Sequence, residues 1–310
     1  MSLALVQHIP HAAGIPFVKG RIAAFVLSTV LMIGSIGAYF VNGLNFGIDF
    51  TGGISIEIQT EEAADLGLIR ELAGGLDLGA VEVQNFGSDT EVLIRVQAQE
   101  GEGLEAEEAQ QAARERLQTA LDDNYPGGVE YRSVEVLGAK VSGELQRAGA
   151  LAVGVALLLM LIYIWFRFEW QYSVGAILAL VHDVILTIGM FAVTQLEFNL
   201  STIAAILTIV GYSMNDTVVV YDRIRENIRK FRKMELAELL NLSINDTLSR
   251  TILTSMTTLV ALFALWAIGG AALQGFAFAM IFGVAVGTYS SIFVAAPILM
   301  VTKVARESSD

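Results

Sequence analysis

Six long apolar runs constrain the fold of this 310-residue sequence more than any other feature. Each run approaches or exceeds the about 20 apolar residues that a helix needs to cross a bilayer. One such run could be a core helix of a soluble domain, but six in a chain that is 54% hydrophobic predict a polytopic α-helical membrane protein. The expected membrane helices are residues 22–41, 147–166, 171–193, 200–222, 250–269 and 275–301.

The first run is preceded by Lys19 and Arg21, as the hydrophobic region of a signal peptide would be. It is longer than the usual signal-peptide core of about 7–15 residues, and no clear small-x-small cleavage site follows it. We therefore expect an uncleaved first membrane helix.

The net charge of −13 is concentrated in one segment. Residues 43–146 contain 21 acidic and 6 basic residues, whereas the rest of the chain contains 11 and 13. This difference predicts an acidic soluble domain at 42–146, followed by a bundle of five membrane helices at 147–302.

Basic residues in the short connections predict the orientation, because Lys and Arg are retained in the cytoplasm. Residues 223–233, RIRENIRKFRK, hold six of them, whereas the opposite connections TQLEFN and GGAALQ hold none. We expect a multi-pass membrane protein with both termini in the cytoplasm and the domain at 42–146 outside, in a bacterial periplasm or its equivalent. The expected cytoplasmic parts are an N-terminal tail at 1–21, a basic loop at 223–247 and a C-terminal tail at 303–310.

The acidic segment has the pattern of a small α+β domain. Alternation in ISIEIQ is typical of a half-buried strand, and GSDT at 87–90 is typical of a hairpin turn. The order βαββαβ predicts a ferredoxin-like fold, which by itself identifies no function. It fits an acidic domain that holds partners as well as a surface that contacts an unfolded polypeptide. The expected strands are 54–59, 80–86, 91–97 and 129–137, and the expected helices are 62–75 and 104–123.

Two charged residues lie inside the apolar runs at similar depth. Asp216 lies in the fourth run and Arg250 near the corresponding end of the fifth, although a charge near the bilayer centre costs about 2.5–3.5 kcal/mol. A static ion pair that fixes helix packing would offset this cost. A proton pathway is the functional alternative, because burial and a nearby arginine act oppositely on a carboxyl group. Arg250 could also reach the membrane interface alone.

Polar neighbours of this pair are candidate supporting residues. Asn215 adjoins Asp216, and Thr254 belongs to a run of hydroxyl residues that begins at Thr251. Such residues often bond back to their own helix, but their number favours a wet interior. Asp183 follows His182 in VHDV, and the two either serve packing or take part in proton movement.

Small residues recur every four positions in the sixth run. This stripe predicts close packing against another helix, in this chain or in a partner chain. It consists of Ala279, Gly283, Gly287, Ser291 and Ala295.

Enzyme signatures are missing from the sequence. It has no cysteine, and it contains no P-loop, nucleophile elbow or zinc motif. We expect no enzymatic activity, no cofactor, no metal site and no nucleic-acid partner.

Several motifs together resemble the SecD/SecF family of bacterial protein-export membrane proteins, in the resistance–nodulation–division superfamily. The size of the outer domain matches the SecF-like members better than the SecD-like members. The motifs are GIDFTGG at 47–53, VLGAKVSGEL at 136–145, VHDV at 181–184, GYSMNDTVVVYDRIREN at 211–227, RTILTSMTTL at 250–259 and GVAVGTYSSIFVAAP at 283–297.

The resemblance implies a subunit that pairs with SecD, attaches to the SecYEG channel and uses the proton-motive force to promote preprotein translocation. Its expected partners are therefore SecD, SecYEG, the translocating preprotein and membrane lipids. Asp216 and Arg250 fall on the family's proton-pathway aspartate and arginine. A proton-driven exporter of small molecules or lipids from the same superfamily is the alternative, and a purely structural assembly subunit is a third interpretation.

Overall fold

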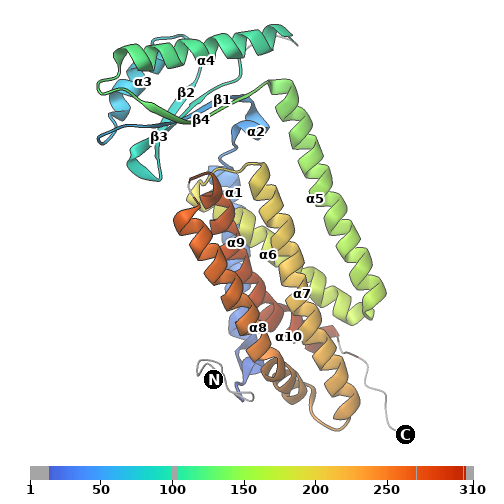
Figure 1. Ribbon diagram of the computed structural model, residues 1–310. Coiled ribbons are helices and arrows are strands. Elements are labelled where there is room, and N and C mark those ends of the chain that lie inside the picture. Colours follow the sequence, from blue (N-terminus) through green and yellow to red (C-terminus); the bar gives the residue numbers. More distant parts are fainter. Residues whose placement is uncertain (1–13, 100–103, 270, 303, 305–310) are drawn as a thin grey trace. The chain divides into compact units, whose positions relative to one another are not determined.

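The computed structural model describes residues 14–99, 104–269, 271–302 and 304 (Figure 1). Most of both expected tails therefore lies outside the described residues. The chain divides into two compact units. The helical unit comprises residues up to Asn45, 153–196 and the chain from Ser201 onward, and the sheet unit comprises 46–152 and 197–200.

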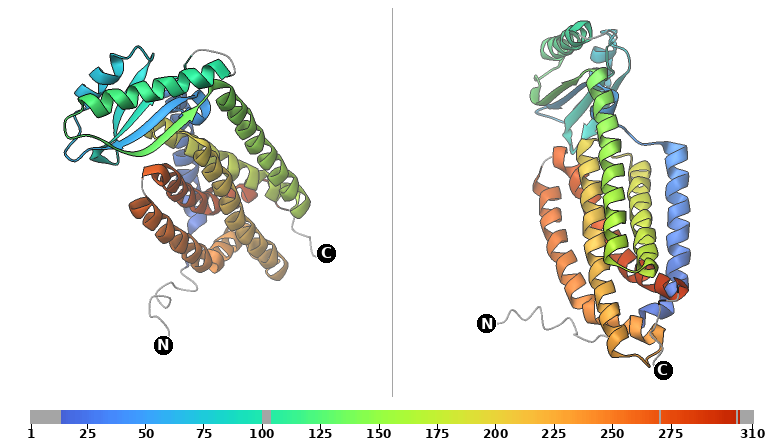
Figure 2. Two further views of the ribbon diagram at one scale, coloured as in Figure 1. Left: turned by 45° about the horizontal axis from the view of Figure 1, so that its top comes forward. Right: turned by 90° about the vertical axis from the view of Figure 1, so that its right-hand side faces the viewer.

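Long helices form the helical unit (Figures 1 and 2). Six spans in the described chain are long and apolar enough to cross a membrane, as expected from the sequence. The last span is composite, because a π-helix interrupts it. The helices are α1 (Arg21–Asn42), α5 (Ala139–Arg167, which begins in the sheet unit), α6 (Trp170–Thr194), α7 (Leu200–Lys230), α8 (Leu236–Ile268), α9 (Ala271–Ser290), the π-helix η3 (Ser291–Ala295) and α10 (Ala296–Thr302), preceded by a short 3-10 helix, η2 (Phe17–Gly20).

Burial differs sharply between the spans. In α6 and in the last span, 61% of the most apolar window is buried within the chain, against 11% in α1 and α5. Helix α6 packs against α1 and α9, and α8 packs against α9. The centre of the helical unit is therefore built by α6, α7 and the last span.

The expected loop at 223–247 is mostly helical. Helix α7 continues to Lys230 and α8 begins at Leu236, so that only five residues connect them. These extensions hold each other through polar contacts. Asn227 donates a hydrogen bond to the hydroxyl of Ser243 at 3.0 Å, and Arg223 forms an ion pair with Asp246 at 2.8 Å. Polar residues that end an apolar run thus continue the helix, because the neighbouring helix supplies partners.

The sheet unit has the predicted βαββαβ order. All neighbouring strands are antiparallel in the order β2-β3-β1-β4, and helices α3 and α4 pack on one face (Figures 1 and 2). The core lies between this face and the helices, where the alternation of β1 places Ile54, Ile56 and Ile58. The elements are α2 (Ile48–Thr51), β1 (Gly53–Gln59), α3 (Leu66–Gly74), β2 (Val81–Phe86), β3 (Ser88–Val96), α4 (Leu104–Asn124) and β4 (Glu130–Leu137).

Two boundaries of the sheet unit differ from expectation for local reasons. Helix α3 begins at Leu66 rather than at 62, because Asp65 caps it by accepting hydrogen bonds from the backbone of Gly67 and Leu68 at 2.9 and 3.0 Å. The expected turn at 87–90 contracts, because β3 already begins at Ser88 and Gly87 adopts a φ of +86°.

Candidate functional site

Asp216 is buried in the helical unit and is held by two hydroxyl groups. Thr251 of α8 donates to its Oδ1 at 2.6 Å, and Ser291, the first residue of η3, donates to its Oδ2 at 2.5 Å. The carboxyl group therefore lies between α7, α8 and the last span. Sequence reasoning placed Thr251 in the polar run of α8 and Ser291 in the small-residue stripe, but it did not connect either residue to Asp216.

Arg250 does not form the expected contact pair with Asp216. Its side chain is exposed, and no ion pair within 4.0 Å joins the two among the described residues. Adjacent residues on a helix point about 100° apart, and here Thr251 is the one that faces α7. Opposite charges on Arg250 and Asp216 therefore attract each other only across more than the 4.0 Å of a salt bridge.

The two supporting residues expected beside this pair are not in contact with Asp216. Asn215 is exposed on α7. Thr254 is exposed as well, and its hydroxyl donates back to the carbonyl groups of Arg250 and Thr251 at 3.0 Å. Thr257 bonds backward in the same way. Part of the polar run is therefore satisfied within its own helix, which weakens the argument for a wet interior.

Asp183 forms a second buried carboxylate cluster, centred on α6. Ser213 of α7 donates to its Oδ2 at 2.5 Å, and Ser290 donates to the same oxygen at 2.7 Å. His182 Nδ1 lies 2.9 Å from its Oδ1. The His182 ring stacks on Tyr289, and its Nε2 has no hydrogen-bond partner among the described residues.

Consecutive serines connect the two clusters. Ser290 ends α9 and contacts Asp183, whereas Ser291 begins η3 and contacts Asp216. Helix α7 also serves both clusters, because Ser213 and Asp216 lie three residues apart, on one face. The helical unit therefore holds two buried carboxyl groups, and each accepts hydrogen bonds from its own pair of hydroxyl groups. Single-turn π-segments frequently occur at functional sites.

The small-residue stripe packs against α7. A Cβ atom at Gly287 would lie 2.9 Å from the Cβ atom of Ser213, and one at Gly283 would collide with Ile209. Farther along, the Ala295 carbonyl accepts a hydrogen bond from Tyr221 at 3.0 Å. The stripe thus allows α7 to approach closely enough for its polar side chains to reach the serines.

The motif GIDFTGG folds as a tight connector in the sheet unit. Asp49 accepts a hydrogen bond from the backbone of Leu200, the first residue of α7, at 2.8 Å. Gly52 and Gly53 have φ angles of +70° and +121°, which non-glycine residues rarely adopt. A Cβ atom at Gly52 would also lie 3.1 Å from the backbone of Ala139. The paired glycines therefore allow β1 to start directly beside the beginning of α5.

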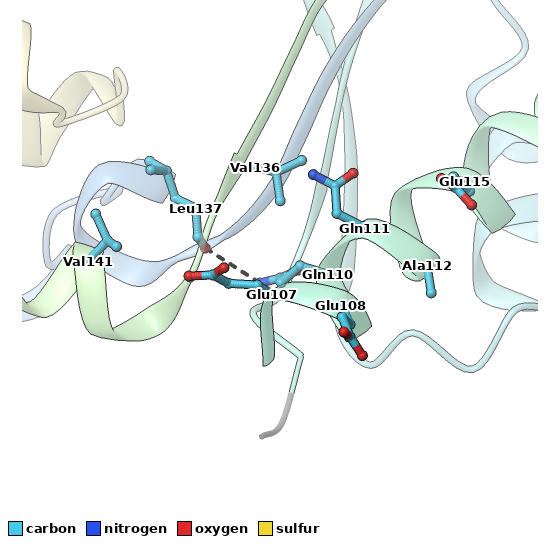
Figure 3. A pocket seen from close by; sticks show the side chains of 10 residues that line it. Glu107, Glu108, Gln110, Gln111, Ala112, Glu115, Val136, Leu137 and Val141 are labelled. Atoms are coloured by element: carbon cyan, nitrogen blue, oxygen red, sulfur yellow. Dashed lines mark hydrogen bonds between the residues drawn. The ribbon is translucent and has the colours of Figure 1, made fainter. Parts of the chain in front are cut away.

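A groove also lies beside β4 in the sheet unit, as Figure 3 shows. It has a volume of about 590 Å³. The Gln110 side chain donates to the Leu137 carbonyl at 3.4 Å, and its own Oε1 is buried without a partner in the described chain. β4 is an edge strand of the sheet. The groove therefore combines the half-buried end of β4 with acidic side chains of α4, Glu107 and Glu108 among them.

Comparisons with known proteins find two matching family models. The family described as protein export membrane protein SecD/SecF, C-terminal, matches residues 116–305, and the SecD/SecF GG motif matches residues 40–64. Protein translocase subunit SecF from Rickettsia akari is 45% identical over 299 residues, covering 96% of this chain and 95% of that protein. The protein of the same name from Rickettsia rickettsii is 46% identical, with the same coverage.

Two solved structures are similar. The crystal structure of SecDF, a translocon-associated membrane protein from Thermus thermophilus, matches with a TM-score of 0.82 and 36% identity over 93% of this chain. A crystal structure of SecDF in a super-membrane-facing form matches with a TM-score of 0.63 at the same identity and coverage. This chain spans 38% of the length of each of those chains. The chain is a multi-pass membrane protein that belongs to the SecD/SecF family of protein-export membrane proteins.

Proposed function

We propose that this chain is the SecF subunit of a SecD–SecF complex in the bacterial inner membrane. The complex would use the proton-motive force to promote preprotein translocation through the SecYEG channel. Relatives named as SecF subunits cover nearly the whole chain, and the similar solved protein is described as translocon-associated. The basic residues at the end of α7 support cytoplasmic termini and a periplasmic sheet unit.

The observation that carries the proton-coupled part of this proposal is the environment of Asp216. The carboxyl group is buried between three helical segments, yet its contacts are hydroxyl groups rather than a fixed cation. A hydroxyl group can donate to a carboxylate or, after rotation, accept from a carboxylic acid. Thr251 and Ser291 can therefore satisfy Asp216 in both protonation states, as a site that binds and releases a proton requires.

Helix α8 is the element on which this proton acts. It carries Thr251, which donates a hydrogen bond to Asp216, and Arg250, whose positive charge is attracted by the Asp216 carboxylate. Protonation removes the attraction between the carboxylate and the guanidinium group, and this changes the force on α8. One elementary charge crossing 100 mV provides about 2.3 kcal/mol, enough to bias an element with two arrangements of similar energy.

The solved relatives support such alternation. Two SecDF structures match this chain with equal identity and coverage but with TM-scores of 0.82 and 0.63. The matched region therefore differs in arrangement between those two structures rather than in sequence.

The test measures preprotein translocation in vesicles that contain this chain, SecD and SecYEG, with and without a proton gradient. Asp216→Asn keeps the size of the side chain but cannot exchange a proton, so we expect the gradient-dependent fraction of translocation to be lost. Glu226→Gln removes an exposed carboxylate from the same helix and serves as the matched control. Normal gradient dependence in Asp216→Asn would refute the proton-coupled proposal.

A static packing role is separated by replacing the whole cluster. The triple variant Asp216→Leu, Thr251→Val, Ser291→Ala substitutes apolar side chains of similar size for the polar contact, an exchange that buried pairs often tolerate. If the cluster only fixes packing, the folded variant retains gradient-dependent translocation. Our proposal predicts a stable protein that has lost gradient-dependent translocation.

The groove beside β4 is the proposed contact for the translocating chain. An edge strand can pair with an extended polypeptide, and the lining of the groove includes the end of the edge strand β4. Because the sequence contains no cysteine, Gln111→Cys in the groove provides a unique cross-linking site. We expect it to cross-link to an arrested preprotein more strongly than Glu71→Cys on α3, and equal yields would exclude the groove.

A further inference from the structure

A cationic pocket lies in the helical unit where α7 ends. Its volume is about 550 Å³, and it opens between the α5–α6 junction and α7. Its two acidic side chains are already engaged, because Asp222 pairs with Arg167 at 2.8 Å and Glu226 pairs with Arg223 at 2.7 Å. The pocket is lined by Arg167, Asp222, Arg225, Glu226, Arg229 and Lys230.

Four cations at and just after the end of α7 have no acidic partner in the part of the chain that the structure describes, whereas Arg225 lies 4.0 Å from Asp222. Arg229, Lys230, Arg232 and Lys233 are exposed, and none forms an ion pair within 4.0 Å. An adjoining pocket of about 590 Å³ shares Arg229 and Lys230 and contains a single acidic residue, Glu238. This end of α7 therefore presents a surplus of positive charge in a concave surface.

Aromatic side chains indicate the depth of the pocket. Trp165, Phe166 and Trp170 flank the junction and are 69%, 84% and 59% exposed. Exposed tryptophan at the end of a membrane helix is typical of the headgroup region. The guanidinium groups of Arg167 and Arg225 lie over the buried ring of Phe168, at 4.9 and 5.7 Å from its centroid. Stacking on Phe168 fixes the Arg225 guanidinium beside the pocket, whereas the Arg167 guanidinium already donates hydrogen bonds to both carboxylate oxygens of Asp222 at 2.8 Å.

We propose that this pocket binds the phosphate of an anionic phospholipid headgroup. Arginine recognises phosphate through paired hydrogen bonds, and cations next to a membrane helix attract anionic lipids. A free phosphate would use the cations alone, whereas a lipid also covers the exposed Trp165, Phe166 and Trp170 with its acyl chains. The exposed Trp165, Phe166 and Trp170 also argue against a soluble acidic protein as the ligand of this pocket. The inference rests on the membrane fold and not on proton coupling.

The test uses the full-length chain in phosphatidylcholine nanodiscs that contain brominated phosphatidylglycerol or, separately, brominated phosphatidylcholine. Bromine in the acyl chain quenches nearby tryptophan. The chain has three tryptophans, and Trp266→Phe leaves the two beside the pocket as the probes. We expect phosphatidylglycerol to quench them in clear preference to phosphatidylcholine.

Arg229→Gln with Lys230→Gln removes two cations that line both pockets and lack ion pairs, so folding should be retained, as thermal unfolding will check. We expect this pair to weaken the preference about 30-fold. Lys19→Gln with Arg21→Gln removes the same charge beside α1 and should leave it unchanged. The proposal fails if wild type shows no preference or if both pairs lose it equally. It also fails if inorganic phosphate at matched ionic strength abolishes the preference, because the pocket then binds a soluble anion.

Discussion

The two buried carboxyl groups of the helical unit differ in how completely the chain encloses them. Asp183 has no exposed surface and has polar partners on both oxygens, namely Ser213, Ser290 and His182. Asp216 is 9% exposed and has one hydroxyl partner on each oxygen.

We propose that this difference separates a structural carboxylate, Asp183, from one that exchanges a proton, Asp216. A group surrounded by three partners from its own chain loses much when any of them is removed. A group with fewer partners and a remaining accessible side can gain or lose a proton without leaving other polar atoms unpaired. We therefore assign packing chiefly to Asp183 and proton exchange chiefly to Asp216, and variants at and around both residues test this contrast.

The largest expected effect is on folding stability at Asp183. Asp183→Ala leaves Ser213 and His182 without their hydrogen-bond partner, which costs about 1–3 kcal/mol for each unsatisfied group, whereas Ser290 keeps its bond to the Gly287 carbonyl. We expect a much lower thermal unfolding temperature in detergent, followed by tryptophan fluorescence, than for Asp216→Ala. Equal destabilisation of the two variants would contradict the assignment of packing chiefly to Asp183.

A smaller effect is expected where the small-residue stripe meets α7. Gly287→Ala places a Cβ atom 2.9 Å from that of Ser213, which must shift and weaken its bond to Asp183. Overpacking of this kind costs about 1–3 kcal/mol. Gly275→Ala is the control, because nothing lies within 4 Å of the added atom. Thermal unfolding of both variants measures the difference, and equal unfolding temperatures would contradict the close approach.

The two serines should separate stability from function. Ser290→Ala removes one of the three partners of Asp183, and Ser291→Ala removes one of the two partners of Asp216. Each should cost about 1 kcal/mol of stability. We expect Ser291→Ala to shift the pH dependence of gradient-driven translocation, and Ser290→Ala to leave it in place. A shift in both variants would mean that the two clusters exchange protons together.

The smallest effect concerns a third kind of carboxyl group, on the face of the sheet opposite α3 and α4. Burial, followed by the negative charges of Glu135, Glu197 and Glu91, raises the pKa of Glu57 above its usual value. A carboxyl pKa that is higher in the folded state favours folding at low pH. This contribution is complete below the unfolded pKa of about 4.3 and is lost as pH rises through the folded pKa.

Glu57→Gln should therefore stabilise the sheet at neutral pH and give no advantage at pH values below the unfolded pKa. Hydrogen exchange of the β1 and β4 amides, corrected for the intrinsic pH effect, measures this in the full-length chain. Glu71→Gln, on exposed α3, is the control. Faster exchange in Glu57→Gln at neutral pH would contradict the expected sign.

The elements could be predicted where one pattern dominated. Apolar length located the six spans, and alternation located the strands, because both signals are local. Helix ends were less predictable, because the extension of α7 depends on contacts with α8. Asn227 donates a hydrogen bond to Ser243, and Arg223 forms an ion pair with Asp246. Asp216 was conspicuous as a charge in an apolar run. Its partners were not, because Ser291 reaches it only through the close packing of Gly287 against α7.

The π-helix at Ser291–Ala295 sets the direction in which the side chains of α10 point. A widened turn holds one residue more than an α-turn, and each residue of an α-helix advances the direction of its side chain by about 100°. The π-turn absorbs that additional residue, so deleting one residue here would restore an unbroken α-helix and leave α10 facing nearly the same direction. The every-four spacing of small residues therefore does not describe one continuous face across Ser291. A one-residue gap placed elsewhere in this span would instead turn α10 by about 100° while hardly changing the length of the span.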